Sequence, residues 1–158
     1  MYMRNALNTP ARLPLLSQTA EHALRAVLYL GRRPDGSFTS AQEIAEALGA
    51  PSNYMSKTLR VLARHGILRS VRGPSGGFTL AVSPEALTPA RIVEAVDDVR
   101  VPAMCLMGTR PCHPGRPCAV HARWDELRSR VLGPLEDTTI ADLLADADSS
   151  SIAVPNSR

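Results

Sequence analysis

The sequence predicts a mostly α-helical protein with one small β-hairpin and a long C-terminal helix. Two observations support this fold class. Apolar residues recur at helical spacing in most segments, and a glycine-rich turn separates two short strand-like stretches. A third observation is that 158 residues with 44% apolar composition suffice for one compact unit with extensions.

Two helices are predicted first. One begins after Ser17 and ends near Gly31. The apolar residues that share its inner face are Ala20, Leu24, Val27 and Leu28. The other is short: Ser40 and Glu43 form a capping-box pattern at its start, and it ends at Gly49.

A third helix is predicted from Pro51 to Gly66, and its two faces differ in character. The apolar face consists of Met55, Leu59, Leu62 and Ala63. The polar face consists of Asn53, Ser56, Lys57, Arg60 and Arg64. A strand at 67–72, a turn at 73–77 and a returning strand at 78–82 follow. Helix, turn, helix and hairpin in this order predict a winged helix-turn-helix.

The C-terminal half is expected to contain three further helices. Thr88 caps a short one, and a long loop at 99–118 holds all three cysteines. A long helix follows, and we expect Gly133 and Pro134 to end it before Thr139 opens the last helix. The apolar residues of the long helix have the spacing of a coiled-coil seam. This spacing predicts dimerisation through Val120, Trp124, Leu127 and Val131.

These elements predict five regions along the chain. The ends are expected to be disordered, and the winged helix-turn-helix domain to precede the cysteine loop and the dimerisation and terminal helices. In chain order the regions are 1–14, 15–98, 99–118, 119–147 and 148–158.

Charge is divided unevenly along the chain. Residues 1–73 contain ten Lys or Arg against four Asp or Glu, a net charge of +6. Residues 74–158 contain eight against eleven, a net charge of −3. A cationic half of this kind suits a polyanion, because clustered cations displace the counterions that condense on phosphates.

The third helix and the hairpin are the predicted contacts to double-stranded DNA. A helix fits the major groove, where exposed side chains reach base edges and neighbouring cations hold phosphates. In the helices, the candidate residues are Ser40, Ser52, Asn53, Tyr54, Ser56, Lys57 and Arg60. In the hairpin, they are Arg69, Arg72, Ser75, Gly76 and Gly77, the glycines allowing a close approach to the DNA backbone.

The cysteines Cys105, Cys112 and Cys118 have the spacing C-x6-C-x5-C. A structural zinc site prefers a closer cysteine pair, and c-type haem attachment needs C-x-x-C-H. Wide thiolate spacing suits an iron-sulfur cluster, with a weaker fourth ligand. The candidates for that ligand are His121 and Glu21 of the partner subunit.

Several segments together resemble the IscR/NsrR-type winged-helix regulators of bacteria, over about residues 15–144. They are Ser17–Arg25, Ile44–Ala45, Leu59–Leu68, Gly73–Leu80 and the cysteine loop with His121 and Trp124. The resemblance implies a homodimer on a palindromic operator, controlled by iron-sulfur status, nitric oxide or redox stress. It further implies a 2Fe-2S or 4Fe-4S cluster on the three cysteines, with His121 or the partner subunit's Glu21 as fourth ligand. The first cysteine gap is six residues where the best-known members have five, which leaves the cluster type open.

Two alternatives remain open at this point. In one, the cysteines of the same DNA-binding fold form a thiol switch or a zinc site. In the other, the chain is an adaptor that binds proteins. The sequence contains no recognisable catalytic arrangement, membrane span or secretory signal, so we expect a cytoplasmic protein that is not an enzyme and has no small-molecule substrate. His22 and His113 are expected to be exposed bystanders.

Overall fold

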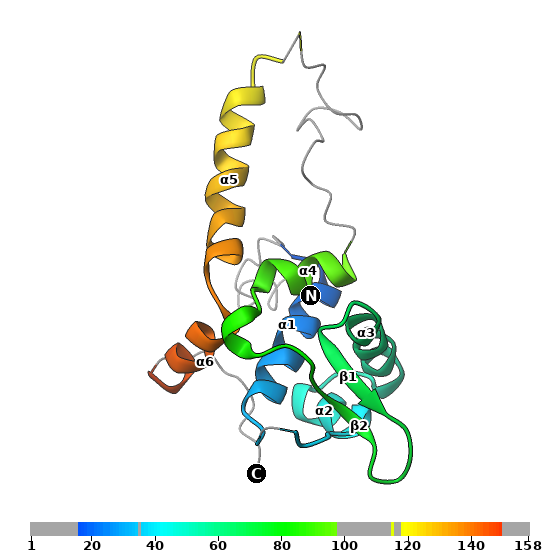
Figure 1. Ribbon diagram of the computed structural model, residues 1–158. Coiled ribbons are helices and arrows are strands. Elements are labelled where there is room, and N and C mark those ends of the chain that lie inside the picture. The colour runs from blue at the N-terminus through cyan, green and yellow to red at the C-terminus, as the bar shows by residue number, and fades with distance from the viewer. Residues whose placement is uncertain (1–15, 35, 98–114, 116–117, 150–158) are drawn as a thin grey trace, which may run out of the picture.

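The computed structural model describes residues 16–34, 36–97, 115 and 118–149; the side chains of Trp124, Asp125, Arg128, Val131 and residues 147–149 are outside that description. Its elements, in chain order, are α1 (Gln18–Gly31), α2 (Ala41–Leu48), α3 (Ser52–Arg64), β1 (Leu68–Val71), β2 (Gly77–Leu80), the 3-10 helix η1 (Pro84–Ala86), α4 (Pro89–Val96), α5 (His121–Asp137) and α6 (Ile140–Ser149) (Figure 1). The predicted fold class, mostly helical with one small hairpin, is confirmed. No helix in the described ranges has both the length and the apolar character needed to cross a bilayer.

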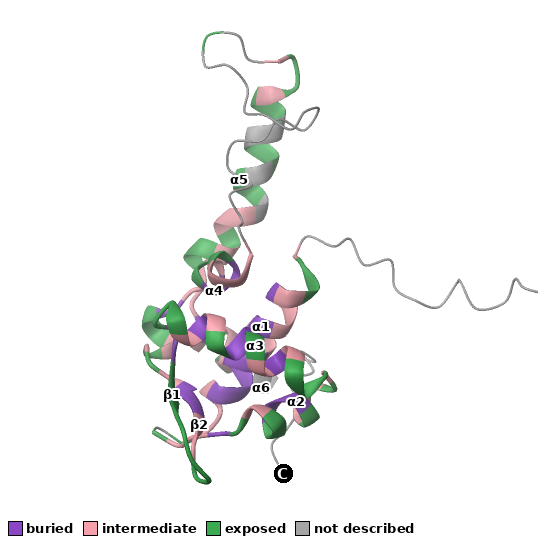
Figure 2. Cartoon of the chain, turned by 90° about the vertical axis from the view of Figure 1, so that its right-hand side faces the viewer, coloured by how far each residue is buried: buried purple, intermediate pink, exposed green. Residues whose placement is uncertain are grey.

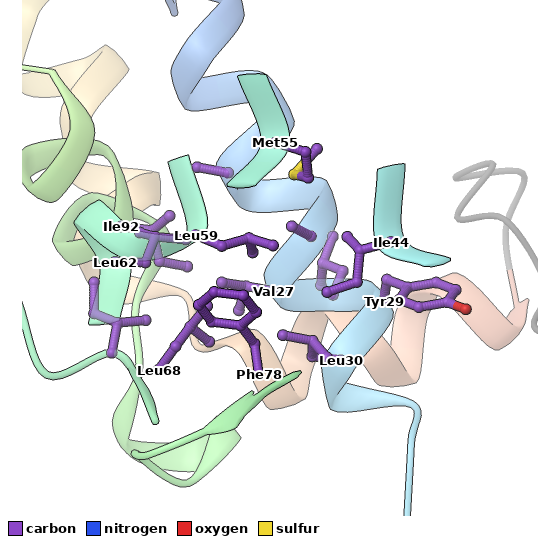
Figure 3. Close-up of a cluster of buried hydrophobic side chains, with 14 of the residues drawn as sticks. Val27, Tyr29, Leu30, Ile44, Met55, Leu59, Leu62, Leu68, Phe78 and Ile92 are labelled. Atoms are coloured by element: carbon purple, nitrogen blue, oxygen red, sulfur yellow. The ribbon is translucent and has the colours of Figure 1, made fainter. Parts of the chain in front are cut away.

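Helix α1 is at the centre of the hydrophobic core. Its buried residues include Val27, and α2, α3, α4 and α6 all pack against it. Met55, Leu59 and Leu62 of α3 are fully buried in the same cluster, together with Ile44 of α2 (Figure 3). Complete burial of each large apolar side chain contributes about 1.5–3 kcal/mol to stability, so this packing fixes α3 firmly on α1.

The predicted boundaries of α1 and α2 are confirmed by their caps. Ser17 Oγ accepts a hydrogen bond from Ala20 N at 3.0 Å, and Ser40 Oγ accepts one from Glu43 N at 3.1 Å. Gly49 ends α2 with a φ of 63°, a left-handed conformation that favours glycine.

The Glu43 carboxylate links α2 to the end of α1. A capping box would direct this carboxylate to the N–H of the cap residue. Here its Oε1 accepts from the Tyr29 hydroxyl at 3.3 Å and forms an ion pair with Arg33. The Arg33 guanidinium also stacks over the Tyr29 ring, 4.9 Å from the centroid. The acid that the motif assigned to a cap therefore stabilises the contact between two helices.

The strands of the wing are shorter than the sequence predicted, but a third segment of backbone pairs with them. Strands β1 and β2 pair antiparallel, with Leu68 opposite Leu80 and Val71 opposite Gly77. Thr39, which lies just before α2, pairs with the other side of β2 in an isolated bridge. Its N–H donates to Phe78 O at 3.0 Å, and Phe78 N–H donates to Thr39 O at 2.8 Å. Strand β2 is therefore hydrogen-bonded on both sides, and the wing is attached to the start of α2.

The predicted end of the long helix was wrong. Helix α5 continues through Gly133 and Pro134 to Asp137. A proline removes one i→i−4 hydrogen bond and usually breaks a helix. Pro134 lies in the last turn, where that loss affects little of the helix, and its own carbonyl still accepts from Thr138 N at 3.3 Å.

Helix α6 folds back onto the first half of the chain. Ile140 is fully buried in the main core, and its N–H donates to Leu87 O at 2.8 Å. A Cβ on Gly31 would lie 2.8 Å from a methyl group of Leu144, so the glycine that ends α1 also lets α6 approach. At the start of α6, hydrogen bonds from the Thr139 hydroxyl and then from its N–H lower the pKa of Asp142.

Helix α5 extends away from this core. Figure 1 shows its N-terminal end as the part farthest from α1, and Figure 2 shows exposed and half-buried residues along its length. A long C-terminal helix is thus present, and its role in dimerisation remains a prediction.

We predict that Gly77→Ala destabilises the protein more than Gly73→Ala. Both glycines have positive φ, 156° and 117°, but only a Cβ at Gly77 meets backbone, 2.3 Å from Thr39 O. Strain plus overlap should lower the free energy of unfolding by about 2–4 kcal/mol. Gly73→Ala, which has open space, should cost about 1–2 kcal/mol. Urea denaturation measures both, and equal losses would contradict the described contact between Thr39 and the wing.

Candidate nucleic-acid interface and cysteine site

The polar face of α3, which is predicted to read DNA and is called the reading face below, points to solvent. Asn53, Lys57 and Arg60 are exposed and Ser56 is half-buried. Their orientation follows from the opposite face, where Met55 and Leu59 are fully buried against the core. Ser52, the first residue of α3, is exposed as well. The helix therefore presents donors and cations along one continuous outward strip.

This strip belongs to a region without acidic residues. Residues 47–84 contain no Asp or Glu, and their five cations are Lys57, Arg60, Arg64, Arg69 and Arg72. All five are exposed, and within the described residues none of them forms an ion pair. Exposed cations without carboxylate partners create a positive potential that attracts polyanions. The arrangement is suited to phosphate groups.

The wing carries the remaining candidates. Arg72 and Ser75 are exposed near its turn. The two glycines have reasons within the wing for lacking a side chain: a Cβ on Gly76 would lie 2.2 Å from Val71 O, and one on Gly77 would meet Thr39 O. These contacts account for both glycines, whereas their predicted close approach to DNA remains untested.

Tyr54 lies between α3 and α1. Its hydroxyl donates to Thr19 Oγ1 at 3.0 Å, and its ring meets the His22 ring edge-on, with centroids 5.6 Å apart. Sequence reasoning had placed Tyr54 only at the DNA. The spacing within α3 did not mark this contact, because Thr19 is 35 residues away in the sequence.

The prediction that His22 is an exposed bystander was wrong. His22 is half-buried against Tyr54, and its Nδ1 is buried without a hydrogen-bond partner among the described residues. His113 lies outside the described residues. Ser40, another candidate contact, is exposed, and its hydroxyl caps α2.

Only part of the cysteine site is described. Cys118 is half-buried just before α5, and its carbonyl accepts from His121 N at 3.0 Å. Cys105 and Cys112 lie outside the described residues. Among the residues with assigned positions, no group of three or more His, Cys, Asp or Glu could hold a metal.

Glu21 lies on α1, where its carboxylate pairs with Arg25 at 2.7 Å. The end of α5 that follows Cys118 is the end remote from α1 (Figure 1).

The candidate dimerisation face lies along α5. Val120 is 36% exposed and Leu127 is 53% exposed, two of the large apolar residues that remain open to solvent. The side chains of Trp124 and Val131, the other two members of the predicted seam, are outside the described set.

The chain is similar in sequence to a known family and to several bacterial proteins. A family model described as "Rrf2: Iron-dependent Transcriptional regulator" matches residues 16–146. A protein of Aquifex aeolicus assigned as an HTH-type transcriptional regulator is 35% identical over 132 residues, covering 82% of this chain and 91% of that protein. The HTH-type transcriptional regulator IscR of Aliivibrio salmonicida is 26% identical, covering 87% and 82% respectively.

Two solved structures have a similar fold. CymR, the global cysteine regulator of B. subtilis, superimposes with a TM-score of 0.70 at 24% identity and covers 83% of this chain and 96% of its own. T. potens IscR gives a TM-score of 0.70 at 23% identity, with coverage of 87% and 91%. At these identities the likeness extends to the fold alone.

Proposed function

The chain belongs to the Rrf2 family of transcriptional regulators, and we propose that it binds double-stranded DNA through α3 and the wing. The observation that supports this most strongly is the exposed surface of residues 47–84, which has five cations and no acid. Replacement of condensed counterions by such cations supplies much of the free energy of DNA binding.

In this proposal α3 enters the major groove. Asn53 and Ser56 lie in its N-terminal half and are suited to base edges, whereas Lys57 and Arg60 are suited to guanine or phosphate. The wing then lies along the neighbouring backbone, where Arg69, Arg72, Ser75, Gly76 and Gly77 are the proposed contacts. Ser40, Ser52 and Tyr54 complete the proposed surface.

We further propose that two copies bind one palindromic operator. The exposed Val120 and Leu127 leave apolar area on α5 that a second α5 would cover, in a seam with Trp124 and Val131. A two-fold dimer presents its two reading helices symmetrically, so the DNA site would be an inverted repeat.

The proposed regulator is a 2Fe-2S or 4Fe-4S cluster on Cys105, Cys112 and Cys118. The donor chemistry suits it, because three thiolates are available and His121 lies within one turn of Cys118. The fourth ligand would be His121 or the partner subunit's Glu21. When bound, such a cluster supplies a centre that responds to oxidants, nitric oxide or iron-sulfur supply. The family's description as iron-dependent also supports this proposal.

Contacts around α1 suggest how a change in the cysteine segment would reach α3. Ser17 Oγ caps α1 and also donates to Asp97 Oδ1 at 2.6 Å. Asp97 lies just before the cysteine loop. Two residues further along, Thr19 accepts the Tyr54 hydroxyl of α3. A shift of the cysteine loop would therefore change the position of Ser17 and, through Thr19, the position of Tyr54 on α3. Such a change would favour one of two arrangements with different operator affinity.

For DNA binding, we predict that Arg60→Ala weakens affinity for duplex DNA and makes the negative slope of log K against log salt shallower by about one, because one phosphate-neutralising cation is lost. Arg91→Ala is the matched control, since Arg91 is exposed on α4, outside the acid-free surface. Fluorescence anisotropy at several salt concentrations measures both. Identical behaviour of the two variants, or a wild-type protein without salt-sensitive affinity for duplex DNA, would contradict the proposal.

For the cofactor, we predict that protein purified without oxygen contains iron and acid-labile sulfide and absorbs visible light. Cys118→Ser should lose all three signals while keeping its circular dichroism spectrum, because serine replaces only the thiol. His121→Ala and Glu21→Gln then identify the fourth ligand. Colourless wild-type protein that contains zinc or a reversible disulfide would instead support the zinc-site or thiol-switch alternative.

A further inference from the structure

One face of the wing brings together side chains from three segments of backbone. Arg69 of β1 is opposite Thr79 of β2, and Thr39 pairs antiparallel with Phe78. Antiparallel pairing therefore places Phe38 opposite Thr79 on its other side, so the three side chains form one cross-strand row. The row lies on the sheet face away from the buried Phe78, because successive residues alternate in direction.

The Arg69 side chain extends across this row. Its Cζ lies 5.4 Å from the centroid of the Phe38 ring, within the range of a cation-π contact. Thr79 beneath it is only 7% exposed, although it is on the outer face of the sheet. Phe38 and Arg69 therefore cover Thr79, and the ring holds the guanidinium in one place.

A second stacked arginine among the described residues differs from Arg69 in how its charge is paired. Arg33 also stacks on an aromatic ring, but its charge is paired with Glu43. Arg69 is exposed, and within the described part of the chain it forms no ion pair. It is therefore oriented by an aromatic ring while its N–H donors remain available for an anion.

We propose that Phe38 is a positioning residue that holds Arg69 in place to bind a DNA phosphate. A free arginine loses rotamer freedom when it binds, and an arginine that is already stacked loses less. Val71, two residues along the same strand face, is 49% exposed and offers an apolar neighbour for the adjoining deoxyribose. The proposal rests on the proposed DNA binding and deepens it: a residue outside the hairpin determines how well the wing binds.

The test measures affinity for a mixed-sequence DNA duplex at several salt concentrations. Phe38→Leu, which keeps apolar cover over Thr79 but removes the ring, should weaken binding about two- to fivefold. It should have no further effect in an Arg69→Ala background. Phe38→Tyr keeps the ring and should bind like the wild type. Phe38→Leu combined with Arg72→Ala is the matched control, in which the two losses should multiply.

A second variant leaves Phe38 in place, which guards against a folding defect in Phe38→Leu. Arg69→Lys keeps the charge but lacks the planar group that stacks. It should weaken binding as much as Phe38→Leu does, with an unchanged salt slope and an unchanged melting temperature.

Independent, multiplying effects of Phe38→Leu and Arg69→Ala, or wild-type affinity in Arg69→Lys, would overturn the inference while leaving DNA binding intact. A wild-type protein that does not bind the duplex would instead refute the proposed function itself.

Discussion

Met55, Leu59 and Leu62 of α3 are fully buried against α1 and its neighbours, and the rest of the proposed surface depends on this contact. Once that stripe is buried, helical geometry leaves Asn53, Lys57 and their neighbours outside. The same central helix also receives α2 through Glu43 and α6 through Gly31. One buried helix thus fixes the direction of the reading face and its orientation to the other elements.

The wing is oriented by a related constraint. Two backbone hydrogen bonds between Thr39 and Phe78 attach it to the residue that precedes the cap of α2. These bonds join the helix-turn-helix to the wing, which suits a surface that must match both a groove and the adjoining phosphates. The same attachment explains the position of the Phe38 ring, because the bridge at the neighbouring Thr39 places this ring beside Arg69.

Local signals in the sequence predicted most helices well. Ser17, Ser40 and Gly49 act within one turn of their own position, and the apolar period of α3 reports directly on its buried face. The contacts that were missed join residues distant in sequence, such as Tyr54 with Thr19 and Thr39 with Phe78. No periodicity records such pairs. The stop predicted at Pro134 was wrong because a proline in a last turn removes little, and the predictions for Cys105 and Cys112 lie outside the described residues.

The central claim is that the outward face of α3 lies against duplex DNA. A photo-crosslinking amino acid placed at Lys57, or as a control at the exposed Glu94 of α4, tests this contact directly. Irradiation of each protein with bound duplex should give a covalent DNA adduct from position 57 and none from position 94. Adducts from position 94 alone, or from neither position while the DNA remains bound, would contradict the account.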